Sequence, residues 1–146
     1  MITFRDSTAA DADRVMEIWR SSVDATHDFL SLEYRAELDD MLSGFLPTAP
    51  LTLAVNEAGN TVGFMLVSDR HLEALFIDPE YRGRGVGRMM LEEALVDRPD
   101  MTTDVNEQNH QAIGFYERME FIRTGRSEVD GQGKPYPLIH LRYAPL

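Results

Sequence analysis

Cysteine is absent from the 146 residues of the chain. The chain can therefore form neither a disulfide nor a thiol nucleophile. It also has no apolar run of about 18 residues, the length that a membrane-spanning helix needs. The opening residues, MITFRDSTAADAD, become acidic at once and show no apolar segment typical of a signal peptide. These absences predict a cytoplasmic protein that does not enter a membrane.

Basic residues are scarce, with 14 Lys and Arg against 25 Asp and Glu, for a net charge of -11. Because nucleic-acid-binding proteins carry basic patches, this balance predicts no nucleic-acid partner. A negative surface attracts cations and is compatible with a cationic substrate, although solubility alone explains it equally well. The four histidines are scattered, with no pair at ligand spacing, so no metal site is expected. The length suits one domain, residues 1–146, acting as a monomer or homodimer.

Hydrophobic periodicity predicts strands alternating with helices. Strands are expected at residues 2–5, 51–55, 61–67, 72–77, 102–105, 121–129 and 138–143. Helices are expected from residue 12 to 23, after Ser31, from the loop at 82–88 to about Val96, and after Asn109. The second helix is expected to bury Tyr34, Leu38, Met41, Leu42 and Phe45. This order indicates a mixed α/β sheet with hairpins at both ends.

The most informative stretch is HLEALFIDPEYRGRGVGRMM, residues 71–90. It is read as a buried strand, a stop at Asp78-Pro79, a glycine-rich turn at Arg82–Arg88, and a helix. Glycines let backbone N–H groups approach a ligand closely, and the start of a helix favours an anion. Three arginines add positive charge. The turn is therefore expected to bind a phosphate group.

Two common phosphate-binding motifs do not match this turn. A Walker loop ends in Gly-Lys-Ser/Thr, which is missing here. The dinucleotide fingerprint G-x-G-x-x-G/A follows its strand directly. Here the spacing is G-x-G-x-G, and Arg88 takes the place of the third glycine.

The turn does resemble the R/Q-x-x-G-x-G/A pyrophosphate loop of the GNAT superfamily of acetyl-CoA-dependent N-acetyltransferases. A second family motif resembles Asn109, Ala112, Phe115-Tyr116 and Phe121 in NHQAIGFYERMEF. The likeness covers roughly residues 1–143 and is greatest to the bacterial YjaB-type branch, through SVDATHDFL, ALFIDP, VNEQN and GKPYPL. It implies the GNAT fold, which is a mixed and mostly antiparallel sheet of about seven strands with about four helices and splayed central strands.

The resemblance implies an acetyl-CoA site. The strands at 71–77 and 102–105 are expected to splay apart and to take the pantetheine arm between them, and the glycine-rich loop is expected to bind the pyrophosphate. The implied cofactor-binding residues are Leu75, Phe76, Ile77, Arg82, Gly83, Arg84, Gly85, Val86, Gly87, Arg88, Asn109 and Tyr116. In this family the helical region before residue 46 walls the acceptor pocket, so His27 and Asp28 either face the substrate or form a packing turn.

Acetylation of an amine requires that a proton be removed, because an alkyl ammonium has a pKa of ~10.4. Family members that use a protein base often take it from the positions of His71 and Glu73, which lie on one face of the strand. The alternative is a structural role for each, with Glu73 bonded to a basic neighbour. His110 and His140 show no comparable placement.

The resemblance places Tyr116 near the thioester sulfur, where its hydroxyl would donate to the departing thiolate, unless the ring only packs on a helix face. The family commonly has Gly where Glu120 stands, which puts the turn geometry there in doubt. The predicted function is transfer of an acetyl group to a primary amine of a small molecule or peptide, by direct attack in a ternary complex. The alternatives are an acyl-CoA-binding regulatory module without catalysis and a nucleotide-binding module.

Overall fold

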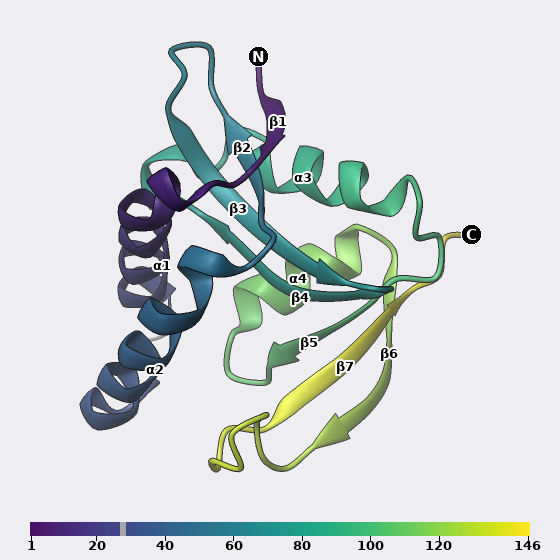
Figure 1. Cartoon of the computed structure of the whole chain (residues 1–146). Helices are drawn as coiled ribbons and strands as arrows, with labels where there is room; N and C mark the ends of the chain where they lie inside the picture. The colour runs from purple at the N-terminus through teal and green to yellow at the C-terminus, as the bar shows by residue number, and fades with distance from the viewer. Residues whose placement is uncertain (27–28) are drawn as a thin grey trace. The chain divides into compact units, whose positions relative to one another are not determined.

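The predicted alternation of strands and helices produces a single mixed sheet (Figure 1). A computed structural model describes residues 1–26 and 29–146. Over these residues the sheet has seven strands, in the order β1-β2-β3-β4-β5-β7-β6, accompanied by four α-helices. The elements are β1 (Thr3–Asp6), α1 (Ala12–Thr26), α2 (Leu32–Phe45), β2 (Thr52–Val55), β3 (Thr61–Ser68), β4 (His71–Ile77), α3 (Val86–Leu95), β5 (Thr102–Asn106), α4 (His110–Arg118), β6 (Phe121–Ser127) and β7 (Leu138–Tyr143).

The strand pairs confirm a mixed, mostly antiparallel sheet. The pairs β1–β2, β2–β3, β5–β7 and β6–β7 are antiparallel, whereas β4 and β5 run parallel. The chain divides into two compact units, one of residues 1–66 and 74–91 and the other of residues 67–73 and 92–146. No helix within the described part of the chain is long and apolar enough to cross a membrane.

The core of the first unit lies between α1 and the strands β2 and β3. The apolar stripe of α1 is buried as its periodicity predicts, with Ile18 0% and Trp19 3% exposed. These side chains pack against Leu53 and Phe64 of the sheet. The backbones of β3 and β4 come close together at Gly63. A Cβ atom at this position would lie 2.9 Å from the carbonyl oxygen of Phe76, which is too close for any side chain.

The prediction for α2 is partly wrong. Ser31 caps the helix as expected, since its hydroxyl accepts a hydrogen bond from the Tyr34 amide at 3.1 Å. Tyr34 is buried and Leu38 and Leu42 pack against the core, but Met41 and Phe45 are 42% and 48% exposed. Periodicity identifies which side of a helix is apolar. How many of those apolar side chains are buried depends on the neighbouring elements that pack against them.

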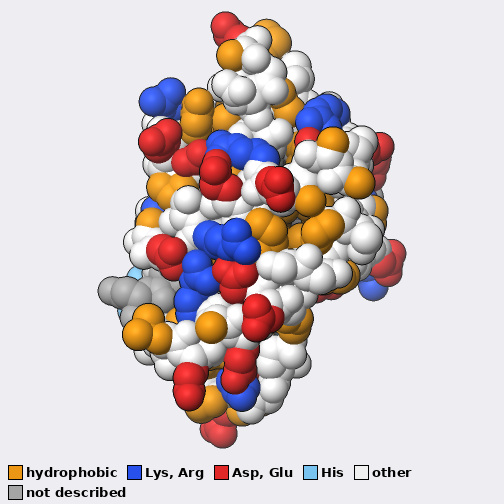
Figure 2. Space-filling view, turned by 60° about the vertical axis from the view of Figure 1, so that its left-hand side comes forward, with side chains coloured by type: hydrophobic (Ala, Val, Ile, Leu, Met, Phe, Trp, Pro, Cys, Tyr) orange, Lys and Arg blue, Asp and Glu red, His pale blue; other side chains and the backbone are white. Residues whose placement is uncertain are grey.

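Ion pairs connect α1 and α2, which lie side by side (Figure 1). Asp39 accepts from Arg20 at 2.7 Å and from Arg35 at 2.9 Å, and Arg35 also binds Asp24. Figure 2 shows Arg and Asp or Glu side chains next to one another on this face. Its charges are therefore largely neutralised locally, although the chain as a whole is acidic.

The second unit is built on the β6–β7 hairpin, with β5 beside β7. α4 packs against this sheet through buried Ile113 and Tyr116, and the Tyr116 and Phe121 rings meet edge to face at 5.4 Å. Glu120, between α4 and β6, has a φ of 71°. A glutamate thus adopts the left-handed conformation at this turn, where glycine is common in the family that the sequence resembles.

Candidate active site

Asp78 stabilises the segment that precedes the glycine loop in the first unit. The Asp78 carboxylate accepts from the Glu80 amide at 3.0 Å, which starts the short 3-10 helix η3 (Pro79–Tyr81). The Arg14 guanidinium of α1 donates to the same carboxylate at 2.7 Å. Burial alone would raise the pKa of Asp78, but the bonds from Arg14 and the Glu80 amide outweigh it and lower the pKa below its usual range.

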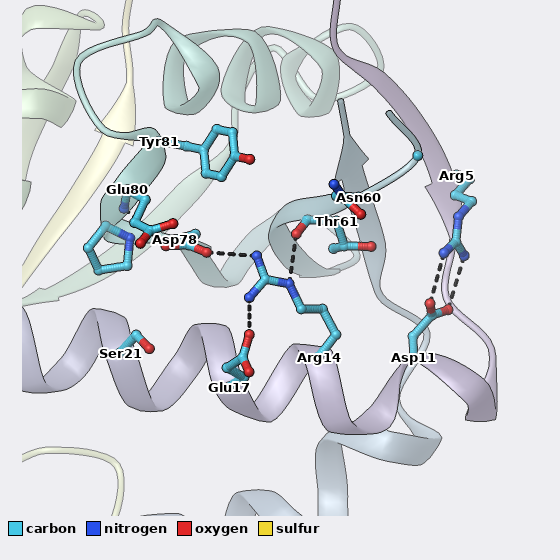
Figure 3. Close-up of a pocket in the computed structure, with 12 residues that line it drawn as sticks. Arg5, Asp11, Arg14, Glu17, Ser21, Asn60, Thr61, Asp78, Glu80 and Tyr81 are labelled. Atoms are coloured by element: carbon cyan, nitrogen blue, oxygen red, sulfur yellow. Dashed lines mark hydrogen bonds and ion pairs between the residues drawn. The ribbon is translucent and has the colours of Figure 1, made fainter. Parts of the chain in front are cut away.

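Arg14 stands in a polar groove of about 730 Å³ (Figure 3). Figure 3 shows its guanidinium between Glu17, Asp78 and the backbone of Thr61, and it donates to the Thr61 carbonyl at 2.9 Å. Arg14 thus links α1, the start of β3 and the end of β4. These contacts fix the segment from which the glycine loop departs.

Two glycines give the loop its open shape. Gly83 and Gly85 have φ values of 74° and 78°, a region in which other residues are strained. No described atom lies within 4 Å of where a Cβ would stand at either position. α3 begins directly afterwards at Val86. The open loop and the helix start suit an anion such as a phosphate group.

Two arginines of the loop make weak contacts with described residues. The Arg84 guanidinium lies 5.1 Å from the centre of the Tyr81 ring, and Arg82 reaches the Ser22 hydroxyl at 3.5 Å. These two long side chains can turn toward an anion at small cost. Arg88 is exposed, and Gly87 is buried in the first turn of α3.

The end of β4 also belongs to the first unit. Leu75, Phe76 and Ile77 are partly buried rather than fully buried as predicted, and the Phe76 ring packs on Phe64 at 5.5 Å. In the described chain β4 is fully buried only at Leu72. A short apolar run in a sequence does not distinguish a fully buried strand from a partly buried one.

Tyr116 is the most enclosed of the predicted site residues in the second unit, with 7% of its surface exposed. Burial raises the pKa of Tyr116 above its usual range, and a hydrogen bond with Thr103 lowers it in part. The Thr103 hydroxyl donates its one proton to the Leu72 carbonyl at 2.9 Å.

Asn109 lies at the start of α4. Its carboxamide oxygen caps the helix by accepting from the Ala112 amide at 3.1 Å. The prediction that Asn109 begins a helix is confirmed.

His71 and Glu73, the two candidate bases, differ in their surroundings. His71 contacts Thr102 through Nδ1 at 2.8 Å and Asp104 through Nε2 at 3.3 Å. Glu73 is exposed and has no ion-pair partner among the residues that the structure describes. The predicted basic neighbour of Glu73 is thus missing from that part of the chain.

Sequence reasoning missed His140. Its Nδ1 atom lies 2.5 Å from Asp104 Oδ1, and its Nε2 atom lies 2.6 Å from the Ser127 hydroxyl. Asp104 therefore lies between His71 and His140.

His27 and Asp28, the predicted substrate contacts, lie outside the described residues. Within the described ranges, no group of three or more His, Asp and Glu side chains is placed to hold a metal ion.

Comparison with known proteins identifies the class of protein to which this fold belongs. Residues 29–136 match the Acetyltransferase (GNAT) domain, and the chain belongs to this family. It is an acyltransferase that takes its acetyl group from acetyl-CoA.

The chain is 57% identical to the peptidyl-lysine N-acetyltransferase YjaB of Escherichia coli over 143 residues, which cover 98% of this chain and 97% of YjaB. The solution structure of the apo form of that protein is 56% identical, covers 100% of this chain and 99% of its own, and superposes with a TM-score of 0.96. The PaiA N-acetyltransferase of Thermoplasma acidophilum in complex with coenzyme A shares the fold, with 19% identity, a TM-score of 0.79 and 99% of each chain covered.

Proposed function

We propose that the protein transfers the acetyl group of acetyl-CoA to the side-chain amine of a lysine in a peptide or protein. The observation that carries this proposal is the 57% identity, over 98% of the chain, to a relative named as a peptidyl-lysine N-acetyltransferase. The acidic surface agrees with it, because a net charge of -11 attracts lysine-rich segments.

The whole chain is proposed to act as one catalytic domain. The family match at residues 29–136 takes in parts of both units, which supports this view. Arg82–Arg88 would hold the pyrophosphate, Leu75–Ile77 would bind the pantetheine arm through their backbone, and Asn109 would contact the same arm. His27 and Asp28 remain predicted substrate contacts.

His71 is the proposed base. A lysine ammonium has a pKa of ~10.4, so only about one molecule in a thousand is a free amine at neutral pH. An imidazole takes up a proton in the neutral range and can pass it to solvent. Glu73, exposed and without a described partner, is the second candidate, acting directly or through water.

Tyr116 is the proposed donor to the departing sulfur. Because burial raises its pKa, the tyrosine stays protonated throughout the working pH range. A thiol has a pKa of ~8.5 and an ordinary phenol ~10, so complete proton transfer is uphill by ~1.5 units, or about 2 kcal/mol, even before burial is counted. Tyr116 therefore acts through a hydrogen bond that strengthens as charge develops on sulfur.

The chain has no cysteine to carry the acetyl group, which supports direct attack by the amine in a ternary complex. The alternative is a regulatory module that binds acyl-CoA without catalysis. The cytoplasmic location, the monomeric or dimeric state and the lack of a nucleic-acid partner stay predictions.

An amine panel tests the proposed acceptor. Acetyl-CoA is incubated with the protein and equal concentrations of lysine peptides, free amino acids, polyamines and aminoglycosides, and the products are identified by mass spectrometry. Lysine peptides should have the highest kcat/KM, and basic flanking residues should raise it further at low salt. Preference for a small amine would contradict the peptide assignment, and CoA binding without any product would favour the regulatory module.

A further inference from the structure

Five side chains form a continuous row of polar contacts across four strands of the second unit. Three of the four links are hydrogen bonds, and the fourth, between His71 Nε2 and Asp104 Oδ2 at 3.3 Å, is an ion-pair contact. We call this row the Asp104 relay. Its members, in order, are Thr102, His71, Asp104, His140 and Ser127.

The strand register brings the relay together. β4 and β5 pair His71 with Thr102, and β5 and β7 pair Asp104 with His140. Side chains alternate along a strand, so Thr102 and Asp104 share one face of β5 while Thr103 and Val105 point to the other. Thr103 meets Tyr116 of α4 on that other face. The relay therefore lies on the sheet face opposite α4.

Donors and acceptors fix the protonation pattern of the relay. An ionised carboxylate only accepts hydrogen bonds, so the ring nitrogens that face Asp104 carry the protons: His140 Nδ1, hydrogen-bonded at 2.5 Å, and His71 Nε2, in ion-pair contact at 3.3 Å. The other ring nitrogens, His71 Nδ1 and His140 Nε2, then carry lone pairs. The hydroxyls of Thr102 and Ser127 donate to them. Every bond is satisfied only if the two rings adopt opposite tautomers.

We propose that Asp104 and His140 are positioning residues for the base His71. This role rests on the proposed acetyl transfer. Asp104 holds His71 in the tautomer that offers Nδ1 as the proton acceptor, and it stabilises the imidazolium that forms. His140 donates to the second carboxylate oxygen and keeps Asp104 oriented toward His71.

The proton balance of the step is simple. One proton passes from the lysine ammonium to the Thr102 hydroxyl oxygen while that hydroxyl gives its own proton to His71 Nδ1, 2.8 Å away, so that the ring becomes an imidazolium and the hydroxyl is restored. The freed amine forms the new N–C bond, and the C–S bond breaks with its electron pair passing to sulfur. Tyr116 donates its hydrogen bond to that sulfur, and solvent later takes the proton from His71.

Other charges close to the relay have to be considered in a pH experiment. Glu73 follows His71 on β4, and Arg142 of β7 lies opposite Thr102. On β6, Arg126 is paired with Glu107 and Arg123 with Glu117. α4, on the opposite face, adds Arg118 and His110. A variant that changes only Asp104 leaves all of these charges in place.

The first measurement needs neither acetyl-CoA nor a substrate. Imidazole 15N chemical shifts in the free protein report which ring nitrogen carries the proton. We expect His71 to be protonated at Nε2 and His140 at Nδ1, with exposed His110 as the internal reference for a mixed tautomer population. In Asp104→Asn both relay histidines should become mixed, whereas Asp97→Asn, an exposed control, should change neither. Mixed tautomers in the unmodified protein would overturn the proposal.

The second measurement is the pH profile of kcat/KM with a lysine peptide. Asp104→Asn should lower kcat at least about tenfold, which is less than the about 10²- to 10⁴-fold that general-base assistance contributes, because His71 itself remains. The acidic limb should move to lower pH, because the imidazolium loses its carboxylate. The KM for acetyl-CoA should change less than about twofold. His140→Gln, which can still donate to Asp104 and accept from Ser127, should retain more of the rate than His140→Phe.

The outcomes separate the two proposals. If the unmodified protein acetylates lysine peptides but Asp104→Asn keeps its rate and pH profile, the relay role is wrong and the proposed function stands. If the unmodified protein acetylates no lysine peptide, the proposed function fails, and the role of the relay in base catalysis fails with it.

Discussion

The glycine loop of the first unit and the Asp104 relay of the second unit contrast in how their residues come together. The loop is contiguous, and its glycines and arginines can be identified along residues 82–88. The relay draws its five residues from β4, β5, β6 and β7, and only the strand register makes them neighbours. The proposed pyrophosphate site is thus encoded locally in this chain, whereas the proposed proton chemistry depends on long-range strand pairing.

Gly85→Asp should have the largest effect on the loop. Its φ of 78° strains any other residue, and an aspartate adds negative charge where a pyrophosphate would bind. A ligand at a hundredfold excess over Kd stabilises a protein by about 2.7 kcal/mol, so acetyl-CoA should raise the Tm of the unmodified protein. The variant should lose this rise entirely. Gly59→Asp, with a φ of 83° in the β2–β3 turn, controls for strain and should keep it.

Tyr116→Phe should separate chemistry from binding in the second unit. The ring and its packing on Phe121 remain, while the hydroxyl is lost. An interaction made only in the transition state lowers kcat and kcat/KM together, and we expect a loss of at least about tenfold. The acetyl-CoA thermal shift should survive. Tyr143→Phe, which alters the neighbouring ring of the same aromatic cluster, is the matched control. Weaker acetyl-CoA binding with kcat intact would mean that Tyr116 only lines the site.

The contrast between local and distant signals also explains which features were predictable. The elements, the caps at Ser31 and Asn109, and the glycine loop follow from short-range rules and are confirmed. The exposure of Met41 and Phe45 and the contact of Asp104 with His140 depend on elements far along the chain. The sequence does show that Thr102 and Asp104 share one face of a strand, because they are two residues apart. It does not show that Asp104 faces His140, because β5 could have paired with β7 in several registers.

Asp78→Asn tests how much the ion pair between Asp78 and Arg14 stabilises the segment before the glycine loop. The asparagine oxygen can still accept from Arg14, but losing the charge should weaken this part-buried bond by about 1 kcal/mol of unfolding free energy. The pKa of folded Asp78 lies below the ordinary value of 3.8, so its stabilisation is complete above that pH. It is lost as the pH falls through the lower pKa of the folded state. Urea unfolding from pH 7 to 3 should show the difference between the variant and the unmodified protein shrinking toward acid. A constant difference would mean that the charge of Asp78 is irrelevant.

Glu120→Gly should have the smallest effect and the opposite sign. The left-handed conformation costs a non-glycine residue ~1 kcal/mol, and the greater freedom of glycine in the unfolded chain offsets part of the gain. Thermal unfolding should therefore show a stabilisation below about 1 kcal/mol. Asp69→Gly, at the other non-glycine position of positive φ in the described residues, should gain less, because aspartate tolerates this conformation better. A destabilised Glu120→Gly variant would show that the glutamate side chain stabilises the turn.

The central claim is that the protein catalyses acetyl transfer to lysine rather than merely binding the donor. The most direct test measures CoA thiol release and acetyl-lysine formation together, with one lysine peptide and the same peptide carrying arginine instead. We predict one acetyl-lysine for each thiol released, and release at the background rate with the arginine peptide. Tight acetyl-CoA binding with no acetyl-lysine formed, or equal thiol release with both peptides, would contradict the account.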